Sequence, residues 1–192
     1  MLRLPTGRYA RLEGFGNYLG QTTIRYNLFM IQTVVITGNQ LTDALRALDV
    51  NFILGGKSQQ AFLHKSPARL IAALAQSDES RLRLSLIPLF LEHPEFGARV
   101  KPVAKRLSTS ARLTLQCYYT AAVWLAQQYQ PHKPLPDHFS QELGLTPTAD
   151  VDGNLRELAQ RHKELSGRRI NWLGTYQHAA QVWQKGLEYK HG

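Results

Sequence analysis

The segment 109–130 constrains the fold more than any other part of the chain. Apolar and small side chains recur in it at intervals of three and four residues, which is the spacing of one face of an α-helix. The residues on this stripe are Leu113, Cys117, Thr120, Ala121, Trp124 and Gln128. Hydroxyl side chains at 108–110 can cap the helix, and Pro131 cannot continue it. We therefore expect a long helix here, with its stripe turned toward a core.

Helical signals continue on the N-terminal side of this segment. Ser66 followed by Pro67 is typical of a helix start, with proline at the first helical position. In 81–91, leucines at 82, 84 and 86 alternate with polar residues, which is the period of a strand. Pro88 argues against a central strand, because proline cannot donate to a sheet. We expect a helix over 81–91 with a break near Pro88.

Three more helices are expected on the C-terminal side. A short one spans 137–143 within a proline-rich connection, and a longer one spans 153–165, capped by Asp152 and stopped by Gly167. Asn171 caps the last helix. The inward positions of the two longer helices are Leu155, Leu158, Ala159, His162 and Leu165, then Trp172, Tyr176, Ala179, Trp183 and Leu187. Charge pairs four residues apart can support the first of them, namely Glu157–Arg161 and Glu164–Arg168.

The N-terminal part of the chain lacks this regularity. Residues 1–29 have no clean period, and we interpret them as irregular or partly disordered. The β-branched run 28–36 predicts a strand that ends at the turn 37–39, and 51–54 predicts a second short strand before two glycines. Between them, Asn39 or Thr42 can cap a short helix whose inner face carries leucines at 41, 45 and 48.

These patterns together predict the fold class. We expect a mainly α protein, with one helical domain over 30–192 and an irregular or short β-containing segment before it. A chain of 192 residues can bury a sufficient core without a metal or disulfide. The single cysteine, Cys117, excludes an intrachain disulfide and a cysteine-based zinc site, and its apolar neighbours indicate a core position. No window approaches the roughly 20 apolar residues of a membrane span, so we expect no membrane contact and a cytoplasmic location.

Positive charge is the strongest functional signal. The formal net charge is +9, which favours polyanionic partners. No acidic residue occurs between Glu95 and Asp137, and this stretch contains the candidate binding residues Arg99, Lys101, Lys105, Arg106 and Arg112. Cations on one face, beside the hydroxyl-rich helix start at 108–110, are the groups that phosphates and carboxylates need. The alternative interpretation of the same run is a solvated face beside a loop. A weaker basic cluster at 161–169 is diluted by glutamates.

Patterns that indicate catalysis or metal binding are missing from the sequence. The seven histidines have no HExxH or HxH spacing, and we expect no metal and no cofactor. Gly55 and Gly56 follow an apolar run, as in nucleotidyltransferase folds, but no aspartate follows until Asp78 to hold Mg²⁺. The pair Asp150 and Asp152 is explained by helix capping. We assign no catalytic residue and lean toward a protein that is not an enzyme.

Five segments carry a resemblance to a known family. They are LIPLFLEHPE (86–95), YYTAAVWL (118–125), LPDHFSQELGL (135–145), LAQRHKELSG (158–167) and NWLGTYQHAA (171–180). In these segments, within residues 86–180, the chain resembles an uncharacterised bacterial helical family associated with nucleotidyltransferase-like neighbours. The resemblance covers about half of the chain and transfers no catalytic residue. It implies a small helical accessory protein, one half of a two-gene pair in the style of toxin and antitoxin.

Three functional hypotheses follow. The first is a non-enzymatic accessory or regulatory protein that binds a protein partner, which the resemblance implies to be nucleotidyltransferase-like. The second is a nucleic-acid-binding module, for RNA or DNA, that uses the basic cluster at 99–112. The third is a small enzyme for an acidic or nucleotide substrate, for which the sequence supplies no identifiable base and nucleophile.

Overall fold

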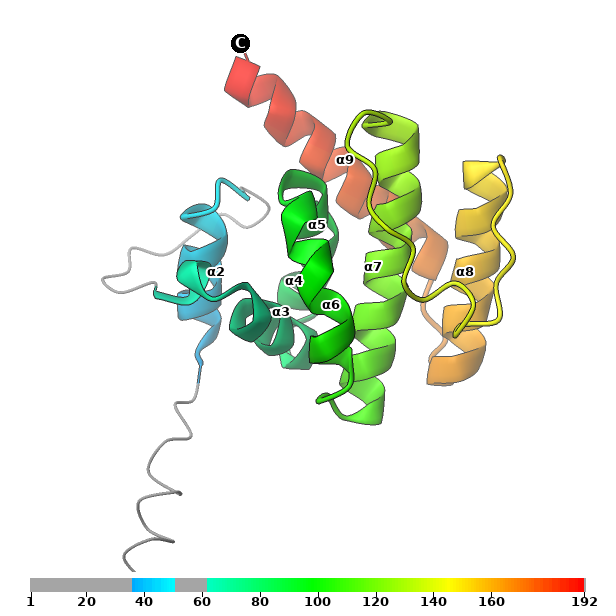
Figure 1. Ribbon diagram of the computed structural model, residues 1–192, viewed down its shortest axis with the longest axis horizontal. Helices are drawn as coiled ribbons and strands as arrows, with labels where there is room; N and C mark the ends of the chain where they lie inside the picture. The colour runs from blue at the N-terminus through cyan, green and yellow to red at the C-terminus, as the bar shows by residue number, and fades with distance from the viewer. Residues whose placement is uncertain (1–35, 51–61, 192) are drawn as a thin grey trace, which may run out of the picture. The chain divides into compact units, whose positions relative to one another are not determined.

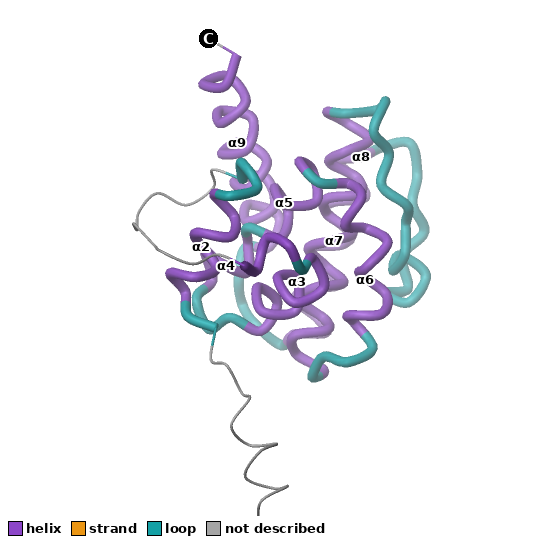
Figure 2. Tube along the Cα trace, turned by 60° about the vertical axis from the view of Figure 1, so that its left-hand side comes forward, coloured by secondary structure: helices purple, strands orange, loops and turns teal. Residues whose placement is uncertain are grey.

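The computed structural model describes residues 36–50 and 62–191, which belong to one compact unit, Ile36–Gly192. Within these two ranges the chain is helical and contains no strand (Figure 2), so the mainly α prediction is confirmed there. The irregular segment 1–29, the strand at 51–54 and all of the strand at 28–36 except Ile36 lie outside the described residues. The elements in order are α2 (Gly38–Arg46), η1 (Phe62–Lys65), α3 (Pro67–Gln76), α4 (Ser80–Leu84), α5 (Leu86–Glu92), η2 (Pro94–Phe96), α6 (Gly97–Ala104), α7 (Thr109–Tyr129), α8 (Val151–Ser166) and α9 (Trp172–His191).

Helix α7 is the centre of this unit. It contacts α3, α5, α6, α8 and α9, and Figure 1 shows it between α5 and α6 on one side and α8 on the other. Every residue from 117 to 126 is buried, so neighbours cover this stretch on all sides rather than along one stripe. The predicted start is confirmed, because the Ser108 hydroxyl accepts from the Ala111 N–H at 3.5 Å. Two residues of the predicted stripe are less buried than expected. Leu113 is half-buried, and Gln128, in the exposed last turn, lies outside the core.

The break in 81–91 falls at Ser85 and not at Pro88. Helix α4 ends there and α5 begins, while the Ser85 hydroxyl donates to the Leu82 carbonyl at 2.6 Å. Pro88 is the third residue of α5, where a backbone N–H has no partner within its own helix. Proline is therefore accommodated in that first turn without a break. Both short helices bury leucines, and α5 lies against α7 and α9.

The connection between α7 and α8 contains no helix at 137–143. The Asp137 carboxylate accepts from the N–H groups of Phe139 and Ser140 at 3.1 and 3.0 Å, which closes a local turn in place of a helix. A single α-type bond, from the Leu143 N–H to the Phe139 carbonyl at 2.9 Å, follows it. The Tyr119 hydroxyl donates to the Pro136 carbonyl at 2.8 Å and fastens this connection to α7.

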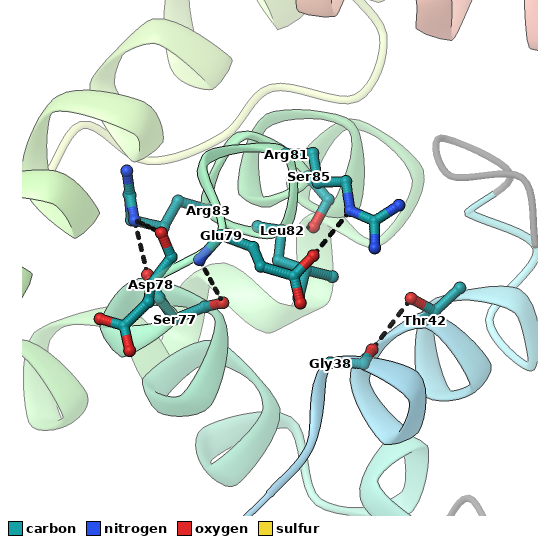
Figure 3. A network of polar contacts seen from close by, with 9 residues as sticks. All are labelled: Gly38, Thr42, Ser77, Asp78, Glu79, Arg81, Leu82, Arg83 and Ser85. Atoms are coloured by element: carbon teal, nitrogen blue, oxygen red, sulfur yellow. Dashed lines mark hydrogen bonds and ion pairs between the residues drawn. The ribbon is translucent and has the colours of Figure 1, made fainter.

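The caps of the remaining helices differ in part from the predictions. Asp150 caps α8 in place of Asp152, and its carboxylate accepts from the Gly153 N–H at 3.0 Å. Gly167 ends α8 with φ of 65°, as predicted. In α2, Thr37 is the cap within a reciprocal pair with Gln40, whereas Thr42 lies inside the helix and donates to the Gly38 carbonyl at 3.0 Å (Figure 3).

The side-chain predictions for α8 and α9 hold with exceptions. Leu155, Leu158 and His162 are buried, but Leu165 is 45% exposed because it lies in the last turn of α8, beyond the packed part of the stripe. Neither of the predicted charge pairs forms in this region; Arg161 pairs instead with Glu164 at 3.3 Å. The cap of α9 is confirmed, since the Asn171 side chain accepts from the Gly174 N–H at 2.9 Å. The α9 stripe is confirmed by burial of Trp172, Tyr176, Ala179 and Trp183, with Leu187 partly buried.

Candidate functional site

Four of the five predicted binding residues are exposed side chains in α6 or directly after it. Arg99 and Lys101 are in α6, Lys105 is its C-cap, and Arg106 follows directly. All four are exposed, while the intervening residues Val100, Val103, Ala104 and Leu107 are buried. Arg99 and Arg106 are seven residues apart and Lys101 and Lys105 are four apart, so each pair follows one flank of the exposed side, opposite the buried residues. We call Arg99, Lys101, Lys105 and Arg106 the α6 basic face.

The charges of the α6 basic face are available to a partner. In the part of the chain that the structure describes, none of the four side chains forms an ion pair or a hydrogen bond. Pro102, on the same exposed side, lies inside α6 without ending it. The cations of the last turn also suit the negative end of the helix dipole, which stabilises them locally. The α6 basic face therefore carries four positive charges that no salt bridge among the described residues neutralises.

Arg112, the fifth predicted residue, forms hydrogen bonds within the protein and is not part of the α6 basic face. Its Nε donates to the Ala104 carbonyl at 2.9 Å, and its Nη2 lies 3.4 Å from the Leu107 carbonyl. The Ala104 carbonyl, at the end of α6, also accepts from the Leu107 N–H at 3.3 Å, and the Leu107 carbonyl lies in the turn that follows. The Arg112 side chain therefore fastens the turn between α6 and α7.

Two adjoining cavities open beside the first turns of α7. Their volumes are about 260 and about 300 Å³. Both are lined by Arg83, Ser110, Thr114 and Arg168. Sequence reasoning missed the two arginines as a pair, because Arg83 belongs to α4 and Arg168 to the link between α8 and α9, and only the tertiary fold brings these distant segments to one place.

Arg83 is held in place by the loop before α4. Its Nη1 donates to the carbonyls of Ser77 and Asp78 at 2.6 and 2.9 Å (Figure 3). Neighbouring Glu79 pairs with Arg81 at 2.7 Å and leaves Arg83 without a carboxylate. Arg168 is exposed, and within the described ranges its guanidinium has no ion-pair partner. Two guanidinium groups thus line the same space, and neither forms an ion pair with a described carboxylate.

An aromatic cluster forms the floor of the larger cavity. The rings of His162 and Trp172 stack with centroids 3.6 Å apart, and His162 Nδ1 lies 2.8 Å from the Tyr176 hydroxyl. Burial, aided by the Arg168 charge, lowers the pKa of His162 from 6.5 to about 4. Burial raises the pKa of Tyr118 to about 12, while the charges of Arg83 and Arg168 act in the opposite direction. The positive field of both arginines therefore reaches the cavity floor, where His162 is neutral near pH 7.

Cys117 is a core residue. It is fully buried, and burial raises the pKa of its thiol to about 12. A protonated thiol is a poor nucleophile and a poor metal ligand, so this position serves packing. Across 36–50 and 62–191, no group of three or more histidine, cysteine or acidic side chains is arranged to hold a metal ion. In the same ranges no helix is both long and apolar enough to cross a membrane.

Comparison with known proteins adds no relative to this description. No protein-family model, no curated protein and no solved structure matches the chain. The proposals below therefore rest on the charge, burial and cavity geometry of the described residues, together with the resemblance in residues 86–180.

Proposed function

We propose that this protein is a non-enzymatic accessory or regulatory protein that binds an acidic segment of a protein partner through the α6 basic face. One observation carries the proposal: four exposed cations lie around the solvent side of α6 and its C-terminal end, and none is paired within the described residues. Arranged cations of this kind speed encounter with an acidic surface and set its register. Buried valines beneath them keep the helix in place.

The class of partner comes from the resemblance. The resemblance makes a nucleotidyltransferase-like protein the first candidate partner. The two proteins of the complex would be encoded by neighbouring genes. We place the complex in the cytoplasm, whose reducing conditions suit a chain with one free cysteine.

Nucleic acid is the second candidate for the same surface. Clustered cations bind phosphates without regard to sequence, and duplex RNA or DNA offers them at close spacing. The α6 basic face carries no aromatic side chain, so it lacks the stacking platform that proteins use on single strands. A duplex bound through its backbone is therefore the form of this alternative that fits α6.

The test compares two double variants that change the net charge equally. Lys105→Glu with Arg106→Glu reverses the α6 basic face, while Lys133→Glu with Lys185→Glu reverses two exposed lysines on other elements. The product of the neighbouring gene, a polyglutamate peptide and RNA and DNA duplexes are the ligands. We expect the α6 double variant to lose binding of the protein and the peptide by at least about tenfold, with the control unchanged.

The salt dependence separates the two candidates. Neutralising about four phosphates gives a log–log slope of affinity against salt of roughly −3 to −4. If the duplexes bind with this slope and neither the neighbouring gene product nor the peptide binds, the nucleic-acid alternative replaces the proposal. If the α6 reversal weakens no polyanion more than the control does, the α6 basic face is a solvated surface and both candidates fail.

A further inference from the structure

The two cavities beside α7 form one space with two different ends. They share the four residues Arg83, Ser110, Thr114 and Arg168, so a single small molecule can extend through both. The smaller cavity continues among polar groups that include Ser77, Asp78 and Ser108. The larger one continues over Leu113, Leu165 and Trp172. A ligand that fits has a charged end and a flat or apolar end.

The shared part of the cavities suits a phosphate. Arg83 and Arg168 supply guanidinium donors, which bind phosphate oxygens more strongly than neutral donors do. Ser110 and Thr114 add hydroxyl groups, and Ser110 lies in the first turn of α7, where the helix dipole favours an anion. Among the residues lining either cavity, Asp78 is the only acid, and it lines the smaller cavity alone. The net charge of the lining is therefore positive where the cavities meet.

The apolar end suits a flat ring. Trp172 is 7% exposed and stacks on His162, which gives this end a rigid aromatic floor. The Trp172 indole N–H is buried and has no hydrogen-bond acceptor within the described residues. A buried donor without an acceptor is uncommon in folded proteins. The volume of about 300 Å³ lies at the small end of the range for ligand pockets, roughly 300–1,000 Å³, and so fits a mononucleotide rather than a larger cofactor.

We infer that this space is a binding site for a small phosphate ester of a flat ring, of the size and chemistry of a nucleoside monophosphate. Arg83 and Arg168 would hold the phosphate at the junction of the cavities, and the ring would lie along Leu113, Leu165 and Trp172. The residues of this site are different from those of the α6 basic face. The inference is therefore independent of the proposed function.

The experiment measures binding of the four common nucleoside monophosphates to the full chain by calorimetry. Inorganic phosphate and adenosine serve as partial ligands: the first carries only the phosphate of a nucleotide, and the second only its nucleoside. Arg168→Glu removes one guanidinium and adds repulsion, and Arg169→Glu is its matched control, since Arg169 is the next residue, is also exposed and is absent from both cavities. Ser110→Asp is a second test, because an acid in the first turn favours α7 while it repels a phosphate.

We expect at least one nucleotide to bind more tightly than phosphate or adenosine alone. Arg168→Glu and Ser110→Asp should each weaken it by at least about tenfold, the effect of losing a charge-assisted contact, with unfolding temperatures preserved. Arg169→Glu and the α6 double variant should bind it normally. The inference is overturned if no nucleotide binds, if inorganic phosphate binds as tightly as every nucleotide, or if the control variants lose as much affinity as the cavity variants.

Discussion

Acid should destabilise this protein through one histidine before its carboxylates begin to titrate. His162 is 2% exposed, and its pKa is about 4 in the folded chain against an ordinary value of 6.5. At pH values between these two, the unfolded chain holds a proton on this ring and the folded chain does not. Stability must then rise with pH across the window. The contribution is complete above about pH 6.5 and declines as the pH falls toward about 4.

The size of the effect follows from the gap between the two pKa values. One unit of pKa corresponds to 1.36 kcal/mol, so the complete loss is about 3 kcal/mol, of which about 2 kcal/mol is lost between about pH 7.5 and about pH 5. This is a large part of the stability of an ordinary domain. Urea unfolding at the two pH values measures it as a difference in the free energy of unfolding.

His162→Phe separates this ring from every other titrating group. Phenylalanine keeps a ring against Trp172, but it loses the bond to the Tyr176 hydroxyl and should cost about 1–3 kcal/mol near pH 7.5. Because phenylalanine cannot take a proton, the stability of the variant should fall by about 2 kcal/mol less than wild type on going to pH 5. Parallel pH profiles for the two proteins would refute the reasoning and show that His162 titrates normally in the folded state.

Four further substitutions or probes test the fold. Trp124→Ala should lower the free energy of unfolding by about 3–5 kcal/mol and Trp124→Phe by clearly less; a silent alanine variant would place this ring outside the core. Gly167→Ala should cost about 1 kcal/mol from its φ of 65° alone, since nothing lies within 4 Å of the added methyl, and an unchanged stability would contradict that conformation. Arg112→Met should cost about 1–2 kcal/mol by removing the guanidinium's hydrogen bonds to the Ala104 and Leu107 carbonyls, yet leave polyanion binding intact; loss of binding at full stability would return this arginine to the binding surface. Cys117 should react with a thiol reagent only after unfolding, so rapid reaction in the native protein would contradict its burial.

Local pattern was sufficient for the long helices. The spacing that places Trp124 on a stripe, and the Asn171 cap that starts α9, are properties of a few neighbouring residues, and both predictions hold. Gln128 and Leu165 satisfy the same periodicity but lie in terminal turns that no neighbour covers, which periodicity cannot express. Helix α7 is more buried than its stripe predicts, because several helices surround residues 117–126. Sequence periodicity does not report how many neighbours a helix has.

Competing local interactions explain the other wrong predictions. Asp137 satisfies two backbone donors itself and so forms a turn where a helix was expected. Pro88 fits the first turn of α5, while Ser85 marks the true junction. That Arg83 and Arg168 line the same cavities could not be predicted, because it depends on the tertiary packing of segments far apart in the sequence. The exposure of the α6 basic face, by contrast, follows from one helix and its end, because its cations alternate with the buried residues Val100, Val103, Ala104 and Leu107.

The all-round burial of α7 also bears on how this sequence can change over time. A surface helix can drift freely on its outer side, but residues 117–126 have no outer side, and three of them are alanines, where an added methylene would push a neighbouring helix away. In divergent homologues, the side-chain sizes at residues 117–126 should therefore be retained even where the charged residues of α6 have changed. Relatives too distant for comparison over the full length would be recognised by that short register of small and aromatic side chains.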